Sequence, residues 1–175
     1  SGPDIPRNQV ISTPVSLVDF HPTLLEMVTG ETGACESDVD GKSINPLFTN
    51  EVNERSVISE YHAVASNNAW YLVRKGAYKL IYYVGFDSPI QLYDINDDPM
   101  EERDLANDPA SSEIRNTMEA ELRKFLDPEE TDRRAKADQA KLIESYGGRD
   151  AVLGRGTFIN SPAPGEDTSF VTEES

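Results

Sequence analysis

Residues 73–109, VRKGAYKLIYYVGFDSPIQLYDINDDPMEERDLANDP, contain the pattern that decides the fold. The Lys75-Gly76 pair separates two runs rich in β-branched and aromatic residues, WYLV and YKLIYYV. This arrangement predicts a β-hairpin, because glycine readily adopts the positive φ of a tight turn. QLYDI predicts a further strand, and Asn96-Asp97-Asp98-Pro99 ends it, since proline cannot donate to a β-ladder. Alternation along the second hairpin strand places three residues on one face: Tyr78, Leu80 and Tyr82.

A helix should cover this sheet. Asp108 suits an N-cap and Pro109 suits the first helical position. Apolar residues then recur at three- and four-residue steps and predict a buried stripe: Ile114, Met118, Leu122 and Phe125. An earlier run, residues 57–61, supplies another strand. The predicted class is therefore α+β, with a four-stranded antiparallel sheet packed against a long C-terminal helix.

The flanking segments have patterns of their own. Residues 15–29 predict a helix that Gly30 ends as a C-cap, with one apolar stripe: Leu17, Phe20, Leu24, Leu25 and Val28. A second helix is expected from Asp127-Pro128 to Tyr146, with Glu130 in a capping box. The tail from Asp150 onward should be extended or disordered.

Composition limits the partners. The 175 residues carry 32 acidic and 16 basic side chains, a formal net charge of −16. A polyanion is repelled by nucleic acid and by anionic membranes, so neither is expected as a partner. The chain contains no apolar run long enough to span a bilayer. Its single cysteine excludes an internal disulfide framework.

Three stretches together resemble one family. The first reads Arg74, Gly76, Tyr78, Lys79, then Gln91-Leu92-Tyr93-Asp94, then Asp98-Pro99, Glu101, Asp104, Leu105 and Ala106. The second is PVSLVDFHPTLLEMVTG, residues 14–30, and the third is SVISEYHA, residues 56–63. Over residues 1–109 they resemble the C-terminal region of type I, formylglycine-dependent sulfatases. The resemblance is greatest to the choline sulfatase-like and arylsulfatase K-like branches. The segment GKSINPLF also resembles a stretch of this family, which implies that Leu47 and Phe48 anchor the loop after residue 30 on the core.

The resemblance implies a division of labour between this chain and a larger domain. It implies the C-terminal subdomain of an alkaline phosphatase-like fold, with residues 1–55 as the end of the large domain, 56–126 as the subdomain and 127–175 as an extension. A formylglycine nucleophile and a divalent cation, usually calcium, would lie in the N-terminal sulfatase domain. The chain therefore looks like a C-terminal fragment that is inactive alone, with that domain as its partner.

Cys35 provides a direct check on the nucleophile. The family converts a cysteine within C/S-x-P/A-x-R, whereas Cys35 is followed by Glu36, Ser37, Asp38 and Val39. We conclude that Cys35 is not the nucleophile, and we expect no catalytic residue in this chain. Asp19 and His21 have a spacing that permits metal ligation. A helix-capping Asp19 and an exposed His21 are the favoured alternative, so no metal site is expected.

Two residues are candidates for substrate binding. His62 follows the 57–61 strand, at a strand end where loops often reach active sites, and an imidazole can donate to an anion. The alternative is a histidine that only hydrogen-bonds the local backbone. Asn67, with Asn68, is a weaker candidate, because amides are equally common as turn formers. Arg74 is expected to be structural and to pair with a neighbouring carboxylate such as Asp94.

The function implied by the resemblance is hydrolysis of sulfate esters, with this part supporting the fold and lining the pocket. A phosphonate or phosphate ester hydrolase of the same superfamily is the alternative enzyme. A non-catalytic module for homo-oligomerisation, formed by the extension, is the alternative from another class. The residues do not decide between choline sulfate, a sulfated sugar and an aryl sulfate, and they leave the localisation unknown.

Overall fold

The computed structural model describes residues 5–31, 33, 39–49, 54–62, 68–87, 89–158 and 170–171. The chain forms two compact units, Ser1–Pro128 and Glu129–Ser175. Cys35 and Asn67 lie outside the described residues.

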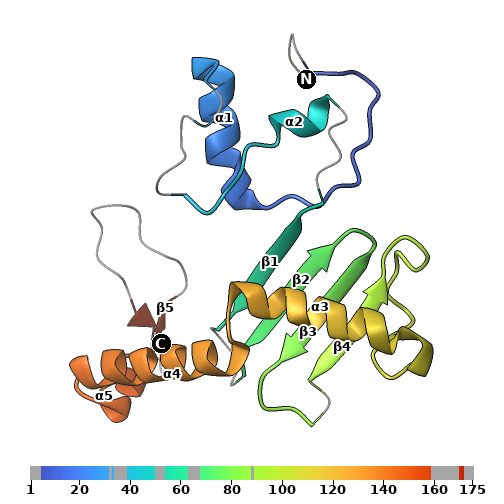
Figure 1. Cartoon of the computed structure of the whole chain (residues 1–175). Helices are drawn as coiled ribbons and strands as arrows, with labels where there is room; N and C mark the ends of the chain where they lie inside the picture. Colours follow the sequence, from blue (N-terminus) through green and yellow to red (C-terminus); the bar gives the residue numbers. More distant parts are fainter. Residues whose placement is uncertain are drawn as a thin grey trace. The chain divides into compact units, whose positions relative to one another are not determined.

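A four-stranded antiparallel sheet forms the centre of the first unit (Figure 1). Its strands follow the chain order: β1 (Ser56–Tyr61), β2 (Trp70–Lys75), β3 (Tyr78–Tyr83) and β4 (Ile90–Asp94). The predicted hairpin is confirmed, since β2 and β3 pair from Lys75 opposite Tyr78 to Trp70 opposite Tyr83. Gly76 has φ +54°, a conformation that L-residues with a Cβ rarely adopt.

One helix packs on the sheet. After a short 3-10 turn, η2 (Pro109–Ser111), helix α3 runs over Ser112–Phe125 and lies across the strands in Figure 1. Asp108 caps this turn as predicted, because its side chain accepts a hydrogen bond from the Ala110 amide at 3.0 Å. The α+β architecture predicted from the sequence is confirmed.

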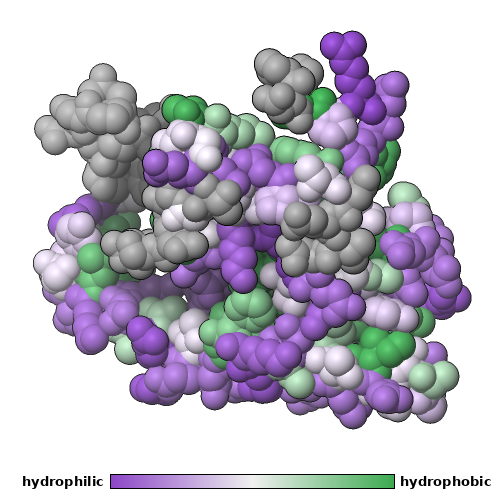
Figure 2. Space-filling model, turned by 45° about the horizontal axis from the view of Figure 1, so that its top comes forward, coloured by the Kyte–Doolittle hydropathy of each residue, from purple (hydrophilic) through white to green (hydrophobic). Residues whose placement is uncertain are grey.

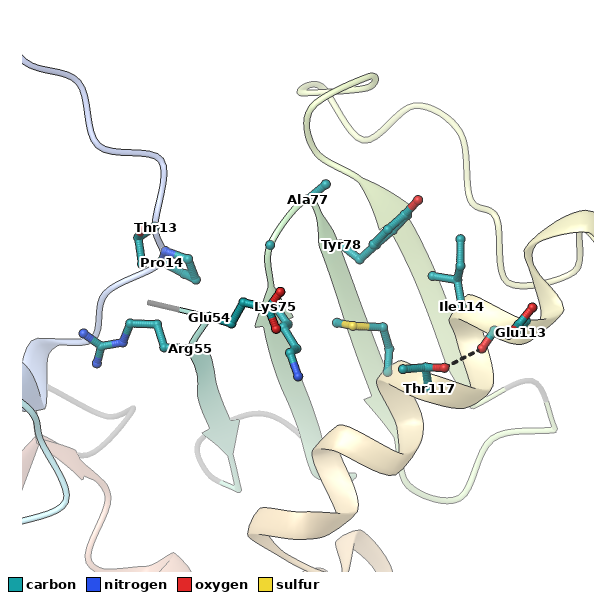
Figure 3. A pocket seen from close by; sticks show the side chains of 12 residues that line it. Thr13, Pro14, Glu54, Arg55, Lys75, Ala77, Tyr78, Glu113, Ile114 and Thr117 are labelled. Carbon is teal, nitrogen blue, oxygen red and sulfur yellow. Dashed lines mark hydrogen bonds between the residues drawn. The ribbon is translucent and has the colours of Figure 1, made fainter. Parts of the chain in front are cut away.

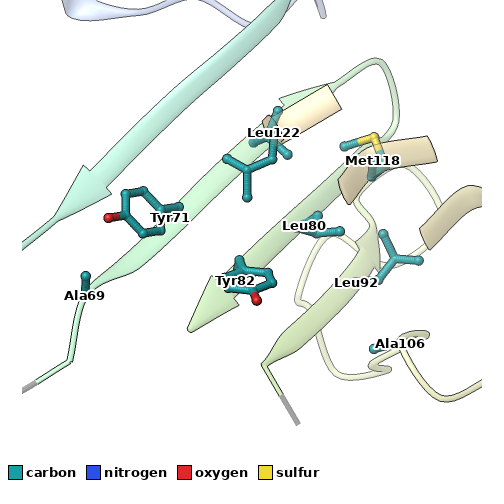
Figure 4. Packing of buried hydrophobic residues seen from close by; sticks show 9 residues of the cluster. Ala69, Tyr71, Leu80, Tyr82, Leu92, Ala106, Met118 and Leu122 are labelled. Atoms are coloured by element: carbon teal, nitrogen blue, oxygen red, sulfur yellow. The ribbon is translucent and has the colours of Figure 1, made fainter. Parts of the chain in front are cut away.

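The hydrophobic core lies between α3 and the sheet (Figure 4). The prediction that Phe125 completes the buried stripe of α3 is wrong, since its side chain is 51% exposed. Phe125 is the last residue of α3, and Leu126 is already extended, so the helix ends before a further turn could bury it. Glu121 occupies a buried position of α3 instead. The strands and α3 together contribute Tyr71, Val73, Leu80, Tyr82, Leu92, Met118 and Leu122 to the core.

The acidic loop after β4 is held by carboxylates that accept backbone hydrogen bonds. Asp98 accepts from the amides of Glu102 and Arg103 at 3.1 and 2.8 Å. Asp104 accepts from the Leu92 amide in β4 at 3.0 Å. Aspartates in such loops satisfy amides that have no ladder partner. These acids therefore define the path of the chain from β4 to α3.

The N-terminal part of this unit contains three short helices: η1 (Leu17–Asp19), α1 (Phe20–Thr29) and α2 (Asn45–Phe48). Gly30 ends α1 with φ +71°, and Leu47 is buried, both as predicted. Asp19 is the N-cap residue of α1, but its side chain forms no cap hydrogen bond with that helix and instead accepts from the Ser16 amide at 2.7 Å in the capping box of η1. That carboxylate accepts from the Lys42 amide at 2.9 Å and from the Arg55 guanidinium at 2.7 Å, so it ties the start of α1 to two later segments.

The second unit contains helix α4 (Pro128–Ser145), which begins at the boundary, helix α5 (Arg149–Gly154) and a two-stranded ribbon, β5 (Thr157–Phe158) with β6 (Phe170–Val171). The expectation of an extended or disordered tail from Asp150 is wrong for the residues that form α5, whereas the two strands of the ribbon are extended. Gly147 and Gly148 have φ +94° and +88° and separate the two helices, which allows the chain to restart as a helix.

Candidate functional site

His62 lies directly after β1, at the end of the strand. Its side chain is 21% exposed, and Nε2 lies 3.3 Å from the Glu60 carboxylate. Its ring meets the Tyr71 ring edge to face, with centroids 5.3 Å apart. Tyr71 is fully buried and donates from its hydroxyl to the Pro128 carbonyl at 3.1 Å. His62 is thus oriented by a fixed neighbour while part of its side chain remains accessible to solvent.

Asn68 is the only described member of the predicted amide pair. Its Nδ2 donates to the Val84 carbonyl at 2.6 Å. A Cβ at Gly85, which has φ +82°, would lie 2.8 Å from that nitrogen. Asn68 therefore links the start of β2 to the end of β3, at the end of the hairpin away from the turn, and its side chain packs over Gly85. This contact assigns Asn68 a structural role.

A cavity of about 520 Å³ lies elsewhere in this unit, beside the hairpin turn (Figure 3). Its walls come from the segment before α1, the start of β1, the turn and the first half of α3. Apolar side chains and two cations, Arg55 and Lys75, line it. Both cations already bind carboxylates, Asp19 at 2.7 Å and Glu121 at 3.2 Å. The cavity therefore offers apolar contacts, and its cations are already neutralised. The apolar part of its lining includes Pro14, Ala77, Tyr78, Ile114 and Met118.

Glu121 is the centre of a cluster of hydrogen bonds and ion pairs. Lys124 donates to it at 2.7 Å, Ser56 at 2.8 Å and Lys75 at 3.2 Å. These hydrogen bonds, led by that from Lys124, lower the pKa of Glu121 from 4.5 to about 2, against the opposing effect of burial. The cluster joins α3 to β1 and β2, so its chemistry is that of a structural ion pair.

Asp19 is the second buried carboxylate of this kind. Burial alone would raise its pKa, but hydrogen bonds from the Lys42 and Ser16 amides and the Arg55 guanidinium lower the pKa below its usual value. Both carboxylate oxygens of Asp19 already accept hydrogen bonds, from the Lys42 amide on one oxygen and from the Ser16 amide and the Arg55 guanidinium on the other. His21, two residues on, is exposed.

The described residues do not fit a metal site. Across the parts of the chain that the structure describes, no group of three or more histidine, cysteine, aspartate or glutamate side chains is placed to hold an ion. The same described part contains no helix with the length and apolarity needed to cross a bilayer. Within this part, His62 is therefore the remaining site candidate.

The fold and the site together define a class of protein. The chain shares its antiparallel sheet under one helix with solved sulfatases. Residues 3–127 match the family model described as N-sulphoglucosamine sulphohydrolase, C-terminal. The chain belongs to this family, and its fold is the C-terminal part of the alkaline phosphatase-like fold.

Relatives and a solved structure agree with this assignment. Arylsulfatase K of Danio rerio is 32% identical over 114 residues, which cover 61% of this chain and 21% of that protein. Choline-sulfatase of Rhizobium meliloti is 33% identical over 97 residues, 55% of this chain and 19% of that protein. The structure of BT1596, a 2-O GAG sulfatase, superposes with a TM-score of 0.50 and 28% identity, over 69% of this chain and 25% of that one. The chain thus spans about a fifth to a quarter of these proteins.

Sequence reasoning missed the environments of two residues. Glu121 looks like one more surface acid of an amphipathic helix, because its burial depends on Ser56 and Lys75, which are distant in sequence. Arg74 forms no ion pair with Asp94 in the described structure. The Asp94 carboxylate instead accepts from the backbone amides of the next turn, residues 96 and 97, at 3.0 and 3.2 Å. The strand pattern alone carried no signal for either outcome.

Proposed function

We propose that this chain is the C-terminal part of a sulfatase that hydrolyses sulfate esters. The family match over residues 3–127 is the observation that carries this proposal. The activity would belong to the whole protein, in which this part supports the fold and contributes a wall of the substrate pocket. Formylglycine and a divalent cation, calcium, would be supplied by the N-terminal domain, where they would provide the nucleophile and stabilise charge on sulfate.

The proposed division of the chain follows the same logic. Residues 1–55 would end the large domain, 56–126 would form the subdomain and 127–175 the extension. The exposed apolar side chains around α1 support the first assignment: Leu17 is 91%, Val28 84% and Phe20 64% exposed. Apolar surface of this kind on neighbouring turns is typical of an interface. The partner would be the large domain of the same protein.

His62 is the proposed contribution of this chain to substrate binding. Its partly exposed ring at the end of β1 supports this role, because an imidazole N–H can donate to a sulfate oxygen or to a sugar hydroxyl. Asn67, which lies outside the described residues, stays a second candidate. Both assignments concern binding, since the nucleophile would come from the N-terminal domain.

Turnover by the full-length protein tests the function. Sulfatase activity should appear with an aryl sulfate, choline sulfate or a sulfated glucosamine, and removal of divalent cations with a chelator should abolish it. A phosphonate monoester cleaved faster than all three sulfates would identify the alternative hydrolase instead. Activity of the 175-residue chain alone would refute the proposed division of labour.

His62→Ala should reduce kcat/KM of the full-length protein by about 10- to 100-fold, mainly through KM, because it removes a donor to bound substrate. His21→Ala is the matched control, since His21 is the other histidine of the chain and is exposed. An equal loss in both variants, or a change in unfolding temperature without a change in KM, would contradict the binding role.

The extension is proposed to join copies of the protein. Leu153 of α5 is 64% exposed in the second unit and would form part of such a contact. Truncation after Gly147 should then convert an oligomer into monomers in light scattering. An unchanged mass would refute this part of the proposal.

A further inference from the structure

The face of the sheet opposite α3 carries an unusual set of side chains. Strand residues alternate between faces, and Tyr71, Val73 and Leu80 point into the core under α3. Their neighbours form the opposite face, which we call the Arg74 face. By register its members are Val57, Ser59, Tyr61, Trp70, Leu72, Arg74, Lys79, Ile81, Tyr83, Gln91 and Tyr93.

The Arg74 face is more apolar than a typical solvent-facing sheet surface. All its members are exposed or partly exposed except Tyr93. Antiparallel sheets that face water usually carry polar residues on that side, so this composition indicates a surface that becomes covered. The side chains form three rows across the strands: an aromatic row with Tyr61, Trp70 and Tyr83, a central row with Leu72 and Ile81, and a row that contains Arg74 and Lys79.

Arg74 is a positive charge on this face that has no carboxylate partner among the described residues. It lies directly opposite Lys79 on β3, and like charges in that position destabilise a sheet. The Lys79 ammonium is neutralised by the Glu101 carboxylate. Arg74 has no corresponding carboxylate among the described residues, and its Nε is buried without a hydrogen-bond partner there. A buried donor left without an acceptor costs free energy that an incoming acceptor would recover.

None of the described acids forms an ion pair with Arg74. Asp94, the neighbour that the sequence favours as a partner for Arg74, accepts the backbone amides of its own turn. An acceptor from outside the described residues is therefore needed. A carboxylate fits best, because the guanidinium fork binds carboxylates in two parallel hydrogen bonds.

We propose that the Arg74 face binds the catalytic domain of the same protein, and that Arg74 receives a carboxylate from that domain. The inference builds on the proposed function, which places such a domain in the same protein. Relatives continue far beyond the matched segment, since it covers only 21% of arylsulfatase K of Danio rerio. A second copy of this chain is a poorer occupant, because the same face of that copy would bring another Arg74 and Lys79 and no carboxylate.

A charge reversal at Arg74 tests the proposal in two settings. In the 175-residue chain alone, Arg74→Glu replaces a like-charge pair with Lys79 by an attractive one, so the unfolding temperature should be unchanged or higher. In the longer protein, Arg74→Glu places two carboxylates together, so the unfolding temperature should fall by at least about 3 °C. In the longer protein, Arg74→Met should have an unfolding temperature between those of the wild type and Arg74→Glu, since it removes the charge without reversing it.

Arg134→Glu is the matched control, because Arg134 is exposed on α4 and the change in net charge is the same. Arg134→Glu should leave the unfolding temperatures of the 175-residue chain and of the longer protein within about 1 °C of their wild-type values. If Arg74→Glu lowers the unfolding temperature in both settings, the acceptor lies within these 175 residues and the proposal is overturned. If it lowers the unfolding temperature in neither setting, no carboxylate pairs with Arg74 and the proposal is also overturned.

Self-association provides a further outcome. If the wild-type 175-residue chain self-associates and Arg74→Glu abolishes this, a second copy is the occupant and the proposal is overturned. These readouts do not depend on turnover, so a failure of the sulfatase assignment would be recognised separately.

Discussion

At the scale of single residues, several aspartates of this chain accept hydrogen bonds from its backbone. Asp98 and Asp104 hold the loop after β4, and Asp19 holds the loop before α2. Asp98 and Asp104, which belong to the acidic motif shared with the family, thus have a role in holding the backbone. Substitutions at such points should alter stability, and the close approach at Gly41 provides a clear case.

Gly41→Ala should destabilise the first unit by about 1–3 kcal/mol, because the added Cβ would lie 1.9 Å from the Val18 carbonyl oxygen. The obstacle is backbone, which cannot rotate away, and the adjacent Lys42 amide would be pulled from Asp19. Urea unfolding measures the loss. Gly154→Ala is the control, since nothing lies within 4 Å of its added Cβ. Equal midpoints for the two variants would show that the loop tolerates displacement.

Glu121 should make stability depend on pH in the acid range. Its folded pKa is about 2 and its unfolded pKa about 4.5, so the folded state binds fewer protons. The stabilisation is complete above pH 4.5 and is lost as the pH falls toward 2, a change of about 2 kcal/mol after allowance for solvent screening. Glu121→Gln should lower stability at pH 7 and flatten this dependence in denaturant titrations.

Glu119→Gln is the control for that experiment. Glu119 lies on the same helix and binds Arg123 at 3.1 Å, but both side chains are about a third exposed. An exposed pair of this kind contributes little. A pH profile that changes as much for Glu119→Gln as for Glu121→Gln would mean that the Glu121 cluster is not the source.

At the scale of elements, α3 holds the sheet through a short segment of its length. Met118 and Leu122 are buried, whereas Phe125 is half exposed. The apolar pattern of the helix therefore overstates the buried stripe by one residue. The helix stabilises the sheet through its middle turns, and its last turn contributes less.

Leu122→Ala should cost about 2–5 kcal/mol, since it opens a cavity in the core against Tyr71 and Leu80. Phe125→Ala on the same helix should cost less than about 1 kcal/mol despite removing a larger side chain, because that ring is half exposed. Thermal or urea unfolding of the two variants compares them directly. A larger loss for Phe125→Ala would show that this ring is covered in solution.

At the scale of the whole molecule, the core belongs to the first unit. The buried cluster and the apolar residues packed on it end at Leu126, before the boundary with the second unit. In the view of Figure 2, hydrophobic residues form separate areas between hydrophilic ones rather than one continuous field. We therefore expect the main cooperative unfolding transition to be that of the first unit.

Truncation after Gly147 should leave the main unfolding temperature within about 2 °C of the full chain, because it removes α5 and the β5–β6 ribbon but no residue of the core. Calorimetry measures this. Truncation after Asn116 is the contrasting variant, since it removes Met118 and Leu122 and should prevent folding. A large fall in the unfolding temperature after truncation at Gly147 would mean that part of the core lies in the second unit.

The sequence by itself determined the hairpin, the four strands, the helix that starts after Asp108 and the family. These features depend on local periodicity, on turn chemistry at Gly76 and Asp108, and on the motifs of residues 1–109, all of which can be read from neighbours in the chain. The exclusion of Cys35 as nucleophile likewise needs only the residues that follow it. Of the site, the sequence placed His62 at the end of a strand.

Only the tertiary structure decided which charges find partners. Glu121 gains Lys75 from a distant strand, and Asp19 gains Arg55. Arg74 gains no carboxylate from the described residues, although Asp94 is a natural partner by sequence. Ion pairs depend on distances of a few ångströms between segments far apart in the chain, and no local pattern encodes those distances. For the same reason, the packing of the last turn of α3 could not be read from the sequence.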